Sequence, residues 1–247
     1  MALLEVCIDS LASARAAIRG GADRIELCSA LALGGLTPFT ALLRQIREES
    51  DIPVRCLMRP RSGDFLYAQD EISLMADQIL ELKSAGADGF VIGCLTANGN
   101  LDAVAMKPLI EAAAGCGLTL HRCIDVSRDP LETYLQAAQL GFDTVLTSGA
   151  ANSCTNGLEM LRSLLELRDI QNGPEVLIGA GVNPGNIQML RTTLPMSRAF
   201  HASCKVMIES QMKFRREDVP MGLPGLDEWH VQQTEEAAVR ELKSAIL

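Results

Sequence analysis

The chain has 247 residues, of which 48% are hydrophobic and 4% aromatic, and its formal net charge is −9 at pH 7. Nucleic-acid binding needs a basic face and, for single strands, stacking aromatic side chains, so this composition argues against it. No apolar run is long enough to span a bilayer. The first residues lack a basic segment and a cleavage site, and we expect a cytoplasmic protein without membrane contact.

Predicted strands and helices alternate along the whole chain. The strands are expected near 3–9, 24–29, 54–59, 89–94, 118–123, 144–149, 175–181 and 199–204. The helices are expected near 10–19, 37–49, 70–85, 102–114, 129–140, 157–168, 186–194 and 234–246. The spacing between strand starts is typical of βα units, eight of which close into a TIM (β/α)8 barrel.

A repeated turn indicates that the strands are parallel. A glycine and an aspartate lead into an apolar run at Gly21-Ala22-Asp23, Gly86-Ala87-Asp88 and Gly141-Phe142-Asp143. Each copy follows a helical segment, which the glycine can end in the left-handed conformation. Strands that are each re-entered after a helix are parallel. The competing architecture, a doubly wound sheet, usually has a glycine-rich fingerprint after its first strand. That fingerprint is missing here, so we predict an α/β fold with a single barrel domain, residues 1–247.

One segment departs from the βα rhythm. Residues 205–233 form a long excursion between the eighth strand and the final helix. Loops of this length are uncommon unless they serve function or make contacts. We expect either a lid over the barrel mouth or a subunit contact, and the second would give a homodimer.

Ionisable side chains gather where the predicted strands end, which is where barrel active sites lie. Glu5 and Glu26 lie early in neighbouring strands and could form structural ion pairs with Arg59 or Arg122. The same polar excess also suits an enzyme acting on a small anionic metabolite, with no organic cofactor indicated. In that hypothesis the catalytic residues are His121, as general acid or base, Asp125 and Glu26. The substrate-binding residues are Arg59, Arg61, Arg122, Ser148 and His201, with the glycine-rich turn at Gly179 and Gly181 as a further anion site.

The eight cysteines include no C-x-x-C pair, and most of them suit the interior as small apolar residues. Cys7 and Cys28 differ, because both lie near the carboxyl ends of neighbouring predicted strands, about 4.8 Å apart. Two thiolates at this spacing suit a soft ion such as Cu(I), although two packed thiols would have the same spacing.

Motifs along the chain resemble those of the CutC family, known as copper homeostasis proteins. They are Leu4-Glu5-Val6-Cys7, Gly20 to Cys28, Gly34 to Pro38, Met58 to Phe65, His121 to Asp125, Val145 to Gly149, Gly179 to Val182, Phe200-His201 and Met212 to Arg215. The resemblance implies a TIM barrel in the cytoplasm, a role in copper tolerance or trafficking, and Cu(I) binding at Cys7 and Cys28. Ser62 and Cys123 depart from the family pattern, which usually has glycine and alanine there. The partner is therefore expected to be either a copper ion or a small anionic molecule.

Overall fold

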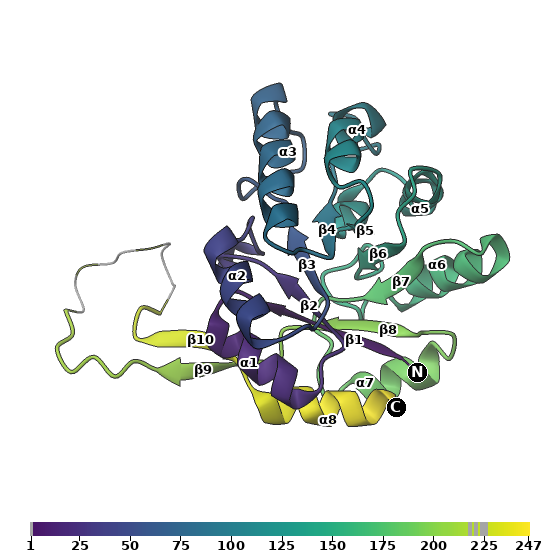
Figure 1. Ribbon diagram of the computed structural model, residues 1–247. Coiled ribbons are helices and arrows are strands. Elements are labelled where there is room, and N and C mark those ends of the chain that lie inside the picture. Colours follow the sequence, from purple (N-terminus) through teal and green to yellow (C-terminus); the bar gives the residue numbers. More distant parts are fainter. Residues whose placement is uncertain (1, 217–218, 220–221, 223–226) are drawn as a thin grey trace.

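The fold is that of a computed structural model, which describes residues 2–216, 219, 222 and 227–247. Eight parallel strands close into a barrel in chain order (Figure 1). They are β1 (Leu3–Ile8), β2 (Arg24–Leu27), β3 (Val54–Leu57), β4 (Gly89–Ile92), β5 (Gly117–Leu120), β6 (Thr144–Thr147), β7 (Glu175–Ile178) and β8 (Ala199–Ala202). The predicted TIM barrel is confirmed, and every strand begins at the predicted position or one residue from it.

Helices surround the barrel and follow the predicted order. They are α1 (Leu11–Gly20), α2 (Thr40–Glu49), α3 (Gln69–Ser84), α4 (Ala103–Ala112), α5 (Pro130–Gln139), α6 (Leu158–Gln171), α7 (Ile187–Thr193) and α8 (Glu236–Ile246), with short 3-10 turns η1 (Leu31–Leu33) and η2 (Arg122–Val126). Helix α2 begins three residues later than predicted, because the backbone of Thr37 donates a hydrogen bond to the Arg59 carbonyl. That bond holds the preceding segment extended.

The repeated turn has a structural role that its sequence did not reveal. Its glycines adopt positive φ, at +90° for Gly21, as expected for residues that end helices. Its aspartates each accept a hydrogen bond from the backbone of the preceding strand. Asp23 accepts from Leu4 at 2.7 Å, and Asp88 and Asp143 accept in the same way from the starts of β3 and β5. Each aspartate therefore ties two neighbouring strands together at the amino end of the barrel.

Alternate residues of the strands point to the two sides of the barrel wall. Leu4, Val6 and Ile8 of β1 belong to the large core between the barrel and its helices. Glu5 and Cys7, between them in sequence, face the barrel interior, where Glu5 is fully buried. This alternation follows from the period of two along a strand, and it brings charged and thiol groups into the interior.

The excursion contains a two-stranded antiparallel ribbon that the sequence analysis did not predict. Strands β9 (Lys205–Glu209) and β10 (His230–Thr234) pair along their length. Figure 1 shows the ribbon projecting sideways from the barrel, next to α1. Residues 217–218, 220–221 and 223–226 of the excursion lie outside the described residues. The lid and the subunit contact both stay predictions, as does the single domain. Across the described part of the chain, no helix is long and apolar enough to cross a membrane.

Candidate functional site

A pocket of about 480 Å³ opens at the carboxyl ends of the barrel strands. This is the end at which TIM barrels carry their active sites. Several predicted site residues line it, contributed by different strands and the loops that follow them. They are Cys7, Glu26, Arg59, His121, Arg122, Gly181 and His201. The rule that placed candidate residues at strand ends therefore located this cavity from the sequence.

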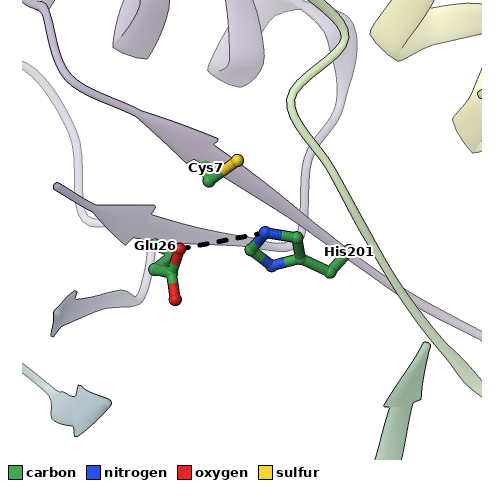
Figure 2. Close-up of side chains that lie close together, drawn as sticks. All are labelled: Cys7, Glu26 and His201. Carbon is green, nitrogen blue, oxygen red and sulfur yellow. Dashed lines mark ion pairs between the residues drawn. The ribbon is translucent and has the colours of Figure 1, made fainter. Parts of the chain in front are cut away.

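Cys7, Glu26 and His201 form the closest group of potential metal ligands in the described part of the chain (Figure 2). Their sulfur, oxygen and nitrogen ligand atoms all lie within 4.8 Å of one another. Strand pairing explains the proximity, because Cys7 lies opposite Glu26 in the β1–β2 pair. His201 lies opposite Glu5 in the β1–β8 pair that closes the barrel. All three side chains are largely buried.

Buried charged side chains contact this group on the side nearer the amino ends of the strands. The Arg24 guanidinium contacts one oxygen of Glu5 at 2.5 Å, and Nδ1 of His201 contacts the other at 2.8 Å. Burial alone would raise the pKa of Glu5, but the hydrogen bond with His201 and the charge of Arg24 lower it to about 2. Glu5 is therefore a carboxylate, and it pairs with Arg24 and His201 rather than with Arg59 or Arg122.

The surroundings raise the pKa values of the other two members of this network, Glu26 and His201, for different reasons. Burial raises the pKa of Glu26, partly offset by His201, whose Nε2 lies 3.8 Å from its carboxylate. Burial alone would lower the pKa of His201, but neighbouring Cys7 and Glu26 and the hydrogen bond with Glu5 raise it well above its ordinary value. Nδ1 of His201 is held by Glu5, so Nε2 is the ring nitrogen directed toward Glu26.

Cys28 lies beside this group but is not part of it. Its thiol donates a hydrogen bond to Glu26 at 3.3 Å, and burial raises its pKa well above the ordinary value. The side chain packs with Leu57 and Val91 inside the barrel. Cys28 therefore contacts one member of the group, Glu26. The predicted two-cysteine pair is not tested by this arrangement and stays a prediction.

Arg59, Phe65 and His121 form a second cluster, here called the donor corner. The Phe65 ring lies 5.4 Å from the Arg59 guanidinium and 4.7 Å from the His121 ring. Nδ1 of His121 accepts a hydrogen bond from the backbone of Cys123, so its proton is on Nε2. Burial and the charge of Arg59 lower the pKa of His121 to about 3. The ring is therefore neutral, and its Nε2–H points away from the turn that Nδ1 caps.

Asp125 and Ser148 position Arg122 instead of contacting His121. The Asp125 carboxylate accepts hydrogen bonds from Arg122 at 2.7 Å and from the Ser148 hydroxyl at 2.9 Å. It also accepts from Thr147 and from the backbone of Ala150. Within the described residues, the contacts of Asp125 thus support a role in holding Arg122 in position.

Two predicted anion-binding features lie differently from expectation. Arg61 is outside the pocket lining and forms ion pairs with Glu71 at 2.6 Å and Asp64 at 3.1 Å. In the glycine-rich turn, Gly181 lines the pocket. The next amides are taken by asparagine side chains: Asn183 donates to Asn186, and Gly185 donates to Asn183. Gly179 lies outside the pocket lining, and a Cβ there would come within 2.7 Å of the Leu146 side chain.

Sequence reasoning missed Phe65 and Lys205 as lining residues. Phe65 ends the same motif that supplied Arg59, so its proximity to that arginine was a usable signal. Lys205 begins β9, directly after the eighth barrel strand. It is also the first residue of the predicted excursion, so its position at the mouth could have been inferred from the sequence.

Comparison with known proteins identifies the family. The pattern that describes the CutC family matches residues 2–206. The chain belongs to the CutC family. A CutC family protein from Vibrio vulnificus strain YJ016 is 40% identical over 245 residues, covering 98% of this chain and 97% of its own. The human copper homeostasis protein cutC homolog is 38% identical over 243 residues, covering 98% of this chain and 88% of its own.

Solved structures agree with this assignment. A CutC protein from Streptococcus agalactiae matches with a TM-score of 0.77 and 29% identity, covering 82% of this chain and 99% of its own. N-(5'-phosphoribosyl)anthranilate isomerase from Pyrococcus furiosus matches with a TM-score of 0.58 and 14% identity, over 100% of this chain and 98% of its own. The isomerase shares the barrel fold alone. The family resemblance seen in the sequence motifs is confirmed.

Proposed function

We propose that this CutC family protein binds Cu(I) at the barrel mouth, with Cys7 as a ligand, in a copper homeostasis role. The observation that supports the proposal most strongly is the group of Cys7, Glu26 and His201, whose ligand atoms lie within 4.8 Å of one another. Thiolate sulfur is a preferred ligand of Cu(I), and imidazole nitrogen also suits copper. The donor set therefore fits the ion, and the human relative's name associates the family with copper.

The buried charges of Glu5 and Arg24 next to the group support the same function. In metal sites, a ligating histidine usually donates its other ring N–H to a carboxylate, which fixes the orientation of the ring. Glu5 makes this contact with Nδ1 of His201 at 2.8 Å, and Arg24 holds Glu5 in turn. The arrangement leaves Nε2 of His201 as the ring nitrogen for the ion, which would replace the proton that the raised pKa keeps on this ring.

Cys28 is the alternative second ligand. The two-cysteine set of Cys7 and Cys28 comes from the sequence and the family resemblance. Cys28 would have to exchange its hydrogen bond with Glu26 for the ion. Both ligand sets share Cys7, so a test of Cys7 applies to either. All eight cysteines are free thiols, and we place the protein in the reducing cytoplasm, which would keep them so.

An anaerobic titration with a competing Cu(I) chelator tests the proposal. We expect Cys7→Ser to lower the apparent affinity at least tenfold, because the thiolate ligand is lost. Comparing Cys28→Ser with His201→Gln then separates the two ligand sets, since the larger loss identifies the partner of Cys7. Cys116→Ser is the matched control, because Cys116 is a partly exposed thiol outside the pocket lining. Wild-type affinity in Cys7→Ser would refute the proposal.

A further inference from the structure

The pocket at the barrel mouth is larger than a metal ion requires, and its lining is rich in cations. A volume of about 480 Å³ lies in the range of small-molecule sites. Its described lining residues include the cations Arg59, Arg122 and Lys205, against the single carboxylate Glu26. In a chain whose net charge is −9, this local excess of positive charge favours an anionic ligand.

The charge of Arg59 is not balanced by a carboxylate. Its terminal nitrogens donate to the backbone carbonyls of Leu33, Gly35 and Gly63, at 3.0 to 3.1 Å. These contacts hold the guanidinium in place without neutralising it. Among the described residues, no ion pair of Arg59 is formed, whereas Arg122 has Asp125. The positive charge of Arg59 therefore acts on the pocket.

Two N–H groups of the donor corner lack partners. Nε of Arg59 and Nε2 of His121 are buried, and neither has a hydrogen-bond partner among the described residues. Buried polar groups in proteins are nearly always hydrogen-bonded, so each exception calls for an explanation. His121 is 4% exposed and lines the pocket, with the Phe65 ring against it. An oxygen atom of a ligand in the pocket would satisfy such a donor.

The structure favours a carboxylate over a phosphate. TIM barrels often hold phosphate with the loops after β7 and β8 and the N-terminus of a short extra helix. Here the amides of Asn183 and Gly185 are engaged by asparagine side chains. Strand β8 is followed by β9 instead of a helix. The side-chain donors of the lining are guanidinium, imidazole and ammonium groups, which bind carboxylates well.

We propose that this pocket binds a small organic carboxylate, with the acid group against Arg59, Arg122 and Lys205 and a further ligand oxygen accepting from Nε2 of His121. Phe65 and the leucine side chains of the lining pack against its carbon atoms. The site uses the β3 and β5 side of the pocket together with Lys205, which follows β8. It does not depend on copper binding by Cys7.

Calorimetric titration of the metal-free protein with malonate, 2-oxoglutarate and benzoate tests this inference, with inorganic phosphate as the competing probe. In His121→Asn the amide oxygen can still accept from the Cys123 backbone, whereas the Nε2–H donor is lost together with the ring that packs against Phe65. Arg122→Gln removes a cation while Asp125 keeps its other donors. Arg128→Gln is the control, because Arg128 lies outside the pocket lining.

We expect at least one carboxylate to bind with a Kd of about 1 mM or tighter. We expect His121→Asn and Arg122→Gln each to weaken it about tenfold or more, with Arg128→Gln unchanged. In 15N-histidine-labelled protein, the Nε2–H signal of His121 should shift on binding. The inference is overturned if no carboxylate binds below about 10 mM. It is also overturned if folded His121→Asn and Arg122→Gln both bind like the wild type, or if phosphate binds tenfold more tightly than every carboxylate.

Discussion

His121 and His201 line the same pocket, yet their surroundings shift their pKa values in opposite directions. His121 is buried beside Arg59, and its pKa is lowered to about 3. Burial would also lower the pKa of His201, but Cys7, Glu26 and Glu5 raise it well above its ordinary value. The two rings differ because β1 and β2 supply carboxylates, whereas the loop after β3 supplies an arginine.

This difference divides the pocket into two chemical halves. The side formed by β1, β2 and β8 presents a thiol, an imidazole and a carboxylate, which suit a soft cation. The side formed by β3 and β5 presents N–H donors and positive charge, which suit an anion. Different barrel strands contribute different side chains to the mouth, so one pocket can carry both chemistries.

Removing the carboxylate that holds His201 should have the largest effect on the difference between the surroundings of the two histidines. In Glu5→Gln, the buried Arg24 loses its charge partner, and the single amide oxygen can no longer accept from both Arg24 and His201. Breaking a buried ion pair in this way costs about 3–5 kcal/mol, so we expect a loss of that size in the free energy of unfolding. Denaturant unfolding measures it. Glu49→Gln, at an exposed pair with Arg15, should unfold like the wild type. Equal stability of Glu5→Gln and the wild type would show that the buried network does not stabilise the fold.

The neutral state of His121 should be visible in the pH dependence of stability. Its pKa is about 3 in the folded protein, against an ordinary value of 6.5. Between these values the unfolded chain binds one more proton at this site, so stability is lost as the pH falls from 6.5 toward 3. In His121→Asn the slope should be smaller by up to about 1.4 kcal/mol per pH unit.

Denaturant unfolding at several pH values, from about 8 down to about 4, compares the two proteins in the range where His121 titrates. Above the ordinary histidine pKa their curves should run parallel, which serves as the internal control. If they also run parallel at lower pH, His121 is not held neutral by the fold.

The barrel was predictable from the sequence because its signals are local. The glycine and aspartate of each repeated turn lie next to each other, and the apolar runs that follow have strand character. The β9–β10 ribbon was not predictable in the same way. Val206, Met207 and Ile208 form an apolar run, but their partners in β10 lie more than twenty residues later. No short turn between the strands marks the hairpin.

The site was predictable in position and less so in detail. Strand ends indicated Cys7, Glu26 and His121 because their place depends on their own strand. The grouping of Cys7 with His201 depends on β1 pairing with β8, which only barrel closure provides. The directions of Asp125 and Arg61 are set by contacts with Arg122 and Glu71 that no spacing rule contains. The enzyme hypothesis stays a prediction.

The position of bound copper tests the central proposal most directly. Crystals soaked anaerobically with Cu(I), with diffraction recorded at the copper absorption edge, would show the ion as an anomalous difference peak. We expect the main peak within bonding distance of the Cys7 sulfur, on the side of His201 and Glu26. A peak between Cys7 and Cys28 would select the two-cysteine set. The absence of a peak at Cys7, or a main peak at a cysteine outside the pocket such as Cys116, would contradict the proposal.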